Sequence, residues 1–426
     1  MRPDSYDPRT EPALLSVVGA SVRAAAGSAR RAGFRVRAAD LYGDVDLRST
    51  ADFEPLEGSY PEGFIEFLEK GPEVPWLYTG ALENRPDLVR TCSALRPLWG
   101  NSAAVLERVR DPAVLQSELR SAGFAFPETR PAQEGTPEDQ DAWLCKPRRS
   151  AAGHGIARTT HTANVNTSSF VYQRFTAGAV RSAVFVGDGN TRRDRHRGCR
   201  ARLLGTTRQL TGIPWLNASE FVWCGNLAPA RLSSQLLNDV KELGIVLVER
   251  FGLRGLFGVD FIETPNGELC VIEVNPRYPA STELIEYAQG IAALEEHAKM
   301  FEGKQSTAEL PSDWGVTEVL GKGILYAPCA LRMPEQLADR MVPQPTPGGG
   351  AVPGLADIPP VGREISAGEP LFTVFATGSS EKTCLANLRT RTEAYATLLN
   401  AHWDRGARLH FQMGAVKEEG EFRAQD

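Results

Sequence analysis

Three oxygen-bearing side chains interrupt two apolar runs in the middle of the sequence. Asp260 lies within 258–263, Glu273 and Asn275 lie within 269–275, and an Asn-Gly turn separates the two runs. Apolar runs joined by a short Gly-containing turn are typical of an antiparallel hairpin. Glu273 and Asn275 are two positions apart and therefore share one face of a strand, where pairing across the turn can bring Asp260 beside them.

Two carboxylates and one carboxamide on a sheet face make an all-oxygen site, which suits Mg²⁺ better than zinc. Burying those charges without a cation would be unfavourable, and the apolar flanking residues disfavour the alternative of a solvent-exposed hairpin. Arg277 follows shortly after Asn275, as expected if the metal also holds phosphate groups. The hairpin therefore predicts a magnesium site beside a phosphate-bearing ligand.

A second group of candidate residues begins at Lys146, which closes an apolar strand at 142–146. The loop that follows, 148–156, is rich in small residues. One ammonium group and several backbone N–H groups can surround phosphates in such a loop, although a plain Gly-rich hairpin is the alternative. The segment is not a P-loop, and the nearest approach to that motif, at 315–323, has the wrong spacing and no Ser or Thr for magnesium.

The elements that must position these residues fall into three parts. The first is a small βαβ unit with an apolar strand at 14–18, an Ala-rich helix at 22–31 and a strand at 34–36. Gly19 and Ser21 lie at the turn between strand and helix, where backbone N–H groups can contact a substrate. A plain tight turn is the alternative, because the sequence has no Gly-x-Gly-x-x-Gly pattern.

The second part opens with a helix at 111–123, for which Asp111 is the expected N-cap and Pro112 the first residue. The segments that follow have an α+β order rather than that of a doubly wound repeat. The predicted strands are 142–146, 169–175, 182–186, 201–205, 220–224, 257–263 and 269–274, and the predicted helix is 232–251. The third part begins near residue 310, with a Pro- and Gly-rich segment at 343–360, a strand at 370–375 and a helix at 381–399.

The hairpin, the lysine strand with its glycine loop and the order of the parts together resemble the ATP-grasp superfamily over roughly residues 10–305. Within it, the run Glu273-Val274-Asn275-Pro276-Arg277 is most similar to the carboxylate–amine ligase and predicted ATP-dependent carboligase branch. The resemblance implies a mixed α/β and α+β chain with an ATP-grasp fold. Its parts would be a pre-ATP-grasp α/β domain at 1–100, an ATP-grasp domain at 101–310 with a lid subdomain at about 125–172, and a small β-rich α+β module at 311–426.

The resemblance also implies a role for each polar residue of the hairpin. Asp260, Glu273 and Asn275 would bind Mg²⁺, with Mn²⁺ as the alternative ion. Lys146 and Arg277 would be the catalytic residues, with Lys146 on the nucleotide phosphates and Arg277 offsetting charge on the transferred phosphoryl group.

ATP is the implied nucleotide, and the glycine loop at 151–155 would close over its phosphates. The strand 172–175 would be a hinge whose backbone meets adenine. The chain has Pro112 where many family members carry a lysine, and Arg110 is the candidate substitute. The residues expected to bind ATP are Lys146, Ala152, Gly153, His154, Gly155, Gln173, Arg174 and Phe175, with exposure in a solvated loop as the alternative for His154.

The implied reaction is the phosphorylation of a carboxylate by ATP, followed by attack of an amine on the acylphosphate. The partners would be small-molecule carboxylate and amine substrates, and a homodimer is the assembly to consider. Arg208, Gly19 and Ser21 are the candidate substrate contacts, with ordinary strand pairing and an outward side chain as the alternative for Arg208. Two other functions stay open: a biotin-carboxylase-like enzyme that phosphorylates bicarbonate, and a non-catalytic ATP-binding module.

Composition argues against several other classes of protein. The 426 residues carry a net charge of −6, which disfavours non-specific nucleic-acid binding. No apolar run is long enough to span a membrane, and the polar N-terminus is unlike a signal peptide. The seven widely spaced cysteines are expected to be free thiols in a reducing cytoplasm. The Arg-rich segment 192–202 is expected to be a solvated hairpin loop, with guidance of an acidic substrate as the alternative.

Overall fold

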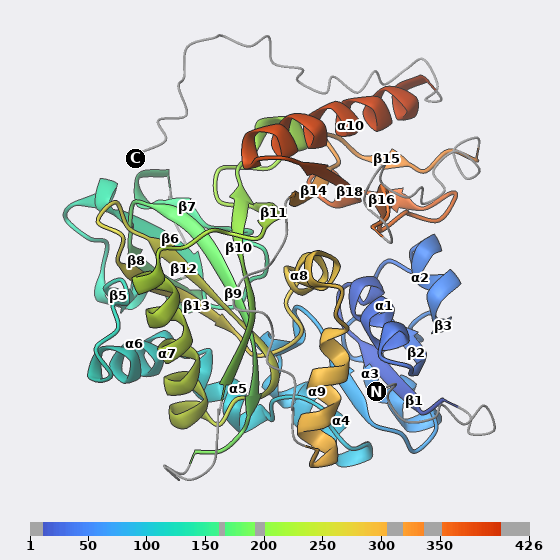
Figure 1. Cartoon of the computed structure of the whole chain (residues 1–426), viewed down its shortest axis with the longest axis horizontal. Helices are drawn as coiled ribbons and strands as arrows, with labels where there is room; N and C mark the ends of the chain where they lie inside the picture. Colours follow the sequence, from blue (N-terminus) through green and yellow to red (C-terminus); the bar gives the residue numbers. More distant parts are fainter. Residues whose placement is uncertain (1–11, 162–166, 192–200, 305–317, 336–351, 402–426) are drawn as a thin grey trace.

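The computed structural model describes residues 12–161, 167–191, 201–304, 318–335 and 352–401 (Figure 1). The N-terminal part is a four-stranded parallel sheet in the order β3-β2-β1-β4. Its strands are β1 (Leu14–Val18), β2 (Arg35–Ala39), β3 (Asp52–Phe53) and β4 (Trp76–Tyr78), and its helices are α1 (Arg23–Arg31), α2 (Val45–Thr50), α3 (Gly63–Lys70) and α4 (Pro86–Leu95). This sheet confirms the α/β fold expected at the N-terminus.

An eight-stranded antiparallel sheet forms the centre of the molecule, in the order β13-β12-β9-β10-β11-β14-β18-β16. Its strands are β9 (Ala179–Asp188), β10 (Ala201–Thr211), β11 (Trp223–Ala228), β12 (Arg254–Glu263), β13 (Leu269–Asn275), β14 (Val319–Tyr326), β16 (Leu355–Ala356) and β18 (Pro370–Gly378). The helices around it are α5 (Ala103–Val109), α6 (Pro112–Ser121), α7 (Ser234–Phe251), α8 (Thr282–Gln289), α9 (Ala293–Glu302) and α10 (Glu381–Ala401). The antiparallel sheet and the parallel one together give the mixed ATP-grasp architecture expected from the sequence.

A second antiparallel sheet, in the order β5-β8-β6-β7, stands at one side of the central sheet (Figure 1). Its strands are β5 (Thr129–Pro131), β6 (Trp143–Pro147), β7 (Ala157–Arg158) and β8 (Phe170–Arg174), and a separate pair is formed by β15 (Leu331–Arg332) and β17 (Glu364–Ile365). Short 3₁₀ helices occupy Leu82–Asn84, Ala132–Glu134, Gln140–Ala142, Thr159–His161, Thr167–Ser169 and Pro214–Leu216. The strand that carries Lys146 therefore belongs to this smaller sheet.

Helix α7 is delimited by local sequence signals and covers one face of the hairpin β12–β13. The hydroxyl of Ser233 accepts a hydrogen bond from the Leu236 N–H (3.2 Å), and Gly252 ends the helix with a φ of +72°. The apolar side chains of the helix recur every three or four residues and are buried against β9, β12 and β13. Burial of this stripe holds the apolar face of the hairpin inward and leaves its polar face to the cavity described below.

Strand β11 differs from the sequence-based expectation. A strand was expected at 220–224, and the structure has it at Trp223–Ala228. Gly225 and the Asn that follows are typical turn residues, but here Gly225 has a φ of +146°, and a Cβ on it would lie 1.9 Å from the Lys322 carbonyl oxygen. Because β14 passes so close, the glycine is needed inside the strand, which continues beyond the predicted end at 224.

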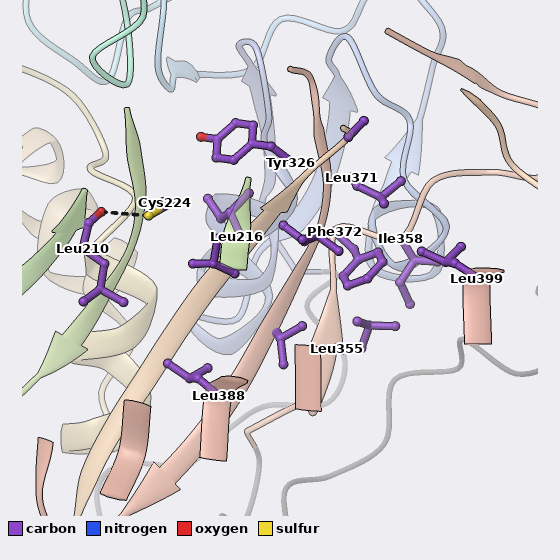
Figure 2. Close-up of a cluster of buried hydrophobic side chains, with 14 of the residues drawn as sticks. Leu210, Leu216, Cys224, Tyr326, Leu355, Ile358, Leu371, Phe372, Leu388 and Leu399 are labelled. Carbon is purple, nitrogen blue, oxygen red and sulfur yellow. Dashed lines mark hydrogen bonds between the residues drawn. The ribbon is translucent and has the colours of Figure 1, made fainter. Parts of the chain in front are cut away.

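The strands after residue 310 continue the central sheet. Strand β14 pairs with β11, and β18 pairs with β14, so the C-terminal strands extend the sheet that begins with the hairpin. Figure 2 shows side chains of the buried cluster that these strands share with α10, among them Leu388 and Leu399 of the helix together with Phe372 and Leu355. Cys224 of β11 belongs to the same cluster and donates a hydrogen bond to the Leu210 carbonyl (3.3 Å, dashed in Figure 2). The division of the chain at 100 and 310 stays a prediction.

Buried charges connect the N-terminal unit to the rest of the molecule. Arg23 of α1 forms ion pairs with Glu283 of α8 and with Asp357, and its Nε lies 2.9 Å from an Asp357 oxygen. Lys322 of β14 lies 2.9 Å from the same Glu283. Burial alone would raise the pKa of Glu283, but the charges of Arg23 and Lys322 outweigh it and lower that pKa. Removing one member of such a group would leave a buried charge without a partner, which typically costs about 3–5 kcal/mol.

The described residues contain neither a membrane-spanning helix nor a disulfide. None of their helices has the length and apolar character that a membrane crossing requires. Their six cysteines are free, and Cys199 lies outside the described residues, as does most of the Arg-rich segment. Arg202, at the end of that segment, forms an ion pair with Glu296.

A truncation in the C-terminal core tests whether that core is continuous with the central sheet. Leu388→Ala removes a fully buried side chain and is expected to destabilise the protein by about 2–5 kcal/mol, because it leaves a cavity. Leu41→Ala is the control, since Leu41 is 44% exposed. The midpoint of thermal unfolding, followed by circular dichroism, should fall clearly for L388A only. Equal midpoints for the two variants would contradict a shared core.

Candidate functional site

The hairpin β12–β13 forms one wall of a cavity of about 660 Å³, which lies within the range of small-molecule sites. Asp260 lies directly opposite Glu273 in the antiparallel pairing, and Asn275 lies opposite Gly258. All three polar side chains line the cavity. The structure thus brings the three residues expected to bind metal to one face, while α7 covers the other.

Hydrogen bonds fix the orientation of the Asp260 carboxylate. Gln209 of β10 donates to one of its oxygens (2.5 Å), and the Asn275 amide donates to the other (2.9 Å). The side-chain oxygen of Asn275 accepts a hydrogen bond from the Arg277 guanidinium (3.1 Å). Gln209 comes from β10, which β9 separates from the hairpin in the same sheet, so the position of the carboxylate depends on the sheet as well as on the hairpin.

The two carboxylates of the hairpin have different electrostatic environments. Burial, and then the negative charge of Glu273, raise the pKa of Asp260 to about 6. Burial would also raise the pKa of Glu273, but the cations Arg110 and Lys146 outweigh it and lower that pKa. Arg110 forms an ion pair with Glu273 and donates to the Asn84 side chain (3.1 Å). Repulsion between paired carboxylates is what a divalent cation relieves.

Lys146 reaches the same cavity from the smaller sheet. Its Nζ donates to the Gln173 side chain across the β6–β8 pair (2.9 Å), and Gln173 in turn donates to the Thr129 hydroxyl (3.1 Å). Burial lowers the pKa of Lys146, and the charge of Glu273 partly offsets that effect. These hydrogen bonds hold the Lys146 ammonium group in the cavity that the hairpin also lines.

The glycine loop covers the cavity and is held there by two contacts. The Trp223 N–H donates to the Ala152 carbonyl (2.9 Å), and the Asn84 amide donates to the Ser150 carbonyl (3.1 Å). Gly153 has a φ of +75°, and a Cβ on it would lie 2.1 Å from the Phe221 carbonyl oxygen. The small residues of the loop are thus required by its close approach to the central sheet.

The remaining residues expected at the nucleotide have mixed placements. Ala152, Gly153 and His154 line the cavity, as do Gln173, Arg174 and Phe175, whereas Gly155 is not among the lining residues. His154 lies edge-on to Tyr326, and burial lowers its pKa. The N–H groups of Arg174 and Phe175 already donate to the carbonyls of Glu128 and Ala142 (both 2.8 Å). Adenine binding by this strand stays a prediction, and it would have to use groups other than these two donors.

The predicted substrate contacts are only partly brought together. Ser21 lines the cavity, whereas Gly19 is not among the lining residues, and a Cβ on it would lie 2.0 Å from the Thr79 hydroxyl oxygen. Arg208 forms an ion pair with Glu381 of α10 (2.6 Å) and is not among the residues that line the cavity. This placement corresponds to the outward alternative for Arg208.

Glu83 is a site residue that the sequence analysis missed. Its side chain is 1% exposed, and one carboxylate oxygen accepts from both Nε (3.0 Å) and Nη2 (2.9 Å) of Arg277. The other carboxylate oxygen is buried without a hydrogen-bond partner in the described structure. Glu83 comes from the N-terminal unit, 194 positions before Arg277, so no local pattern could have paired them.

The donor set fits a magnesium ion that is shared with phosphates. Among the residues that the structure describes, no group of three or more His, Cys, Asp or Glu side chains is arranged to hold a metal ion. Asp260 and Glu273 supply two acidic ligands and Asn275 an amide oxygen, so a bound ion would need further oxygens. Mg²⁺ is commonly bound by one or two carboxylates together with substrate phosphates. The nearby cations Arg110, Lys146 and Arg277 are suited to the same phosphates.

Comparison with known proteins identifies a domain in the middle of the chain. The family model described as an ATP-grasp domain matches residues 109–281. A curated relative, the uncharacterized protein MJ0776 of Methanocaldococcus jannaschii, is 23% identical over 296 residues, which are 63% of this chain and 69% of that protein.

Solved structures share the fold over most of the chain. The biotin carboxylase domain of the Hydrogenobacter thermophilus 2-oxoglutarate carboxylase, a dimer with MgADP, ADP and bicarbonate, has a TM-score of 0.63 at 15% identity, covering 92% of this chain and 94% of that one. N5-carboxyaminoimidazole ribonucleotide synthetase from Thermotoga maritima has a TM-score of 0.61 at 15% identity, covering 89% and 98%. A putative ATP-grasp superfamily protein from Archaeoglobus fulgidus has a TM-score of 0.51 at 15% identity, covering 85% and 99%. The match to residues 109–281 shows that the chain contains an ATP-grasp domain, and these structures show that it shares their fold.

Proposed function

We propose that this protein is an ATP-dependent ligase that activates a carboxylate as an acylphosphate for attack by an amine. The observation that carries the proposal is the meeting of two carboxylates and one carboxamide with two cations at a single cavity wall. The carboxylates are Asp260 and Glu273, the amide is Asn275, and the cations are Lys146 and Arg277. A third cation, Arg110, does not line the cavity but forms an ion pair with Glu273. Such a wall suits a triphosphate with Mg²⁺.

The proposed reaction has two steps. A carboxylate oxygen of the substrate attacks the γ-phosphorus of ATP, the bond to the bridging oxygen breaks, and ADP leaves. The neutral amine then attacks the acyl carbon, an amide bond forms, and phosphate leaves with the proton that the nitrogen loses. Neither step needs a nucleophilic side chain, so the chain's own residues act by positioning and by electrostatic stabilisation.

Each residue of the wall has a proposed part in this chemistry. Lys146 and Arg110 bind the phosphates, and Arg277 offsets the charge that develops on the transferred phosphoryl group. Asp260, Glu273 and Asn275 would hold Mg²⁺, which supplies charge neutralisation of the phosphate oxygens when it is bound. The glycine loop, closed by the Trp223–Ala152 hydrogen bond, excludes water from the acylphosphate.

A carboxylase-type reaction, in which bicarbonate is the phosphorylated acid, is the second candidate. It is favoured by the likeness to the biotin carboxylase domain whose structure holds bicarbonate. ATP hydrolysis that bicarbonate stimulates in the absence of any amine would support this candidate. Stimulation only by an acid and an amine supplied together would support the ligase. Stabilisation by Mg-ATP without hydrolysis in any mixture would support a non-catalytic ATP-binding module.

Replacement of the central carboxylate tests the proposal. Glu273→Gln keeps the shape of the side chain but removes the charge that pairs with Arg110 and the proposed metal, so ADP release should fall at least about 100-fold. The assay measures ADP in a screen of amino acids and small amines. Glu263→Gln is the control, because Glu263 lies on the same hairpin but pairs with Arg181 and does not line the cavity. Undiminished turnover by E273Q, at an unchanged unfolding midpoint, would contradict the assignment.

Glu83 is predicted to position Arg277. In Glu83→Gln the charge that holds the guanidinium is lost, and kcat should fall about 10–100-fold while the KM for ATP changes little. Glu57→Gln, at an exposed ion pair with Lys70, is the matched control on the same unit. A kcat for E83Q equal to that of E57Q would show that Arg277 needs no partner from the N-terminal unit.

A further inference from the structure

The cavity extends from the hairpin to a second group of charged residues, between the N-terminal unit and the C-terminal strands. Tyr42 and Asp44, from the loop before α2, line it together with Asp357 and Arg363. The loop is joined to the C-terminal segment by a hydrogen bond from the Val45 N–H to the Ile358 carbonyl (2.8 Å). This end of the cavity is therefore built by two parts of the chain that are far apart in sequence.

Four of the carboxylates at this end are fully occupied by the protein itself. Asp40 accepts from the backbone N–H groups of residues 22, 42 and 43, at 2.7–3.0 Å. Asp46 accepts from the backbone N–H groups of residues 357 and 358, at 2.9 and 3.0 Å. Glu283 and Asp357 are paired with Arg23, as described above. These four acids have structural roles.

Asp44 is different from the other four. Its side chain is 3% exposed, and the nearest cation among the described residues, Nη1 of Arg363, is 3.9 Å away, beyond hydrogen-bond distance. Although Asp44 is the N-cap residue of α2, its carboxylate makes no capping hydrogen bond. The Arg363 guanidinium lies over the Tyr42 ring instead, 4.5 Å from its centroid. The Asp44 carboxylate is thus a buried acceptor that lines the cavity, and none of the described residues donates a hydrogen bond to it.

The charges around Asp44 indicate which kind of partner its carboxylate lacks. Burial, and then the negative charges of Asp357, Asp40 and Asp46, raise the pKa of Asp44 well above its usual value. Five carboxylates and three cations (Arg23, Lys322 and Arg363) meet at this end, so negative charge is in excess. A buried carboxylate in such a setting is stabilised by a cationic donor.

The missing donor is better explained by an organic group than by a metal ion. The other four carboxylates already accept hydrogen bonds from the backbone or pair with Arg23, so Asp44 alone would be left to hold an ion. The neighbouring cavity wall is apolar and aromatic, with Ile324, Tyr326 and Phe372 among its residues. Apolar walls with one convergent charge are typical of sites for small organic ligands.

We propose that Asp44 binds an ammonium or guanidinium group of the acceptor substrate, in the part of the cavity that Tyr42, Asp357 and Arg363 also line. The group that binds Asp44 is separate from the nitrogen that attacks the acylphosphate, because an attacking amine must be neutral. The acceptor is therefore a molecule with a second, permanently cationic group. This inference rests on the proposed function in taking the cavity as the place where the acceptor binds.

Binding of small probes tests the proposal without requiring turnover. Benzylammonium, benzyl alcohol and benzoate have similar shapes and differ in charge, and their ring suits the apolar wall. Their affinities for the full-length protein, saturated with Mg²⁺ and a non-hydrolysable ATP analogue, are measured by ligand-observed NMR. Benzylammonium should bind about tenfold more tightly than benzyl alcohol, as expected for a charge-assisted hydrogen bond, and benzoate most weakly.

Asp44→Asn supplies the specific readout. D44N should lose the preference for benzylammonium, about a tenfold drop, and leave the affinity for benzyl alcohol unchanged. Asp52→Asn is the control, because Asp52 is exposed and pairs with Arg35 outside the cavity. Equal affinity of the wild-type protein for benzylammonium and benzyl alcohol, or tightest binding of benzoate, would overturn the proposal even if D44N failed to fold. Unchanged benzylammonium binding by folded D44N would overturn it as well.

Failure of the Asp44 proposal and failure of the ligase proposal would appear in different experiments. Loss of the ligase assignment would appear as undiminished ADP release by E273Q, which does not depend on Asp44. Failure of the present inference would appear only in probe binding, with the response of E273Q unaffected.

Discussion

The structure depends on a constraint from electrostatics: carboxylates removed from water need positive partners. Asp260 and Glu273 face each other across a hairpin that is covered on one side by α7, and neither can be ionised there at low cost unaided. Arg110 and Lys146, from two different elements, supply charge to Glu273. Asp260 depends on hydrogen bonds from Gln209 and from the amide beside it, and its charge is the one left for a bound cation to balance.

The same constraint accounts for the way the parts of the chain are joined. Arg23 reaches from α1 to Glu283 and Asp357, and Glu283 is shared with Lys322 of β14. These contacts join the N-terminal unit to α8 and the C-terminal strands (Figure 1). Residues of the N-terminal unit and of the C-terminal strands line the same cavity. A nucleotide at the hairpin and a substrate beside Asp44, as proposed above, would then share a single cavity.

Local pattern was sufficient for much of this architecture. The metal-binding candidates are only 15 positions apart, at Asp260 and Asn275, and the alternation of polar and apolar residues fixes their shared face. Helix α6 begins where Asp111 and Pro112 predict, and the Asp111 carboxylate accepts from the Ala113 N–H (2.8 Å). In each case the residues that make the pattern are close in sequence to the structure that they predict.

Features that depend on distant contacts were not predictable from the sequence. The partner of Arg277 is Glu83, in a short 3₁₀ helix of the N-terminal unit, and no periodicity connects the two. Strand β11 contains Gly225 because β14 passes close to it, although a glycine normally suggests a turn. Arg208 looked like a substrate contact by its position between the hinge and the hairpin, but its side chain pairs with α10.

The most direct test of the account is a crystal structure of the protein with ADP and Mn²⁺, in which the metal is located by its anomalous scattering. The account predicts a manganese peak within coordination distance of Asp260 and Glu273, with the diphosphate between the glycine loop and the hairpin. A manganese ion at any other position, or a diphosphate bound away from Lys146, would contradict it.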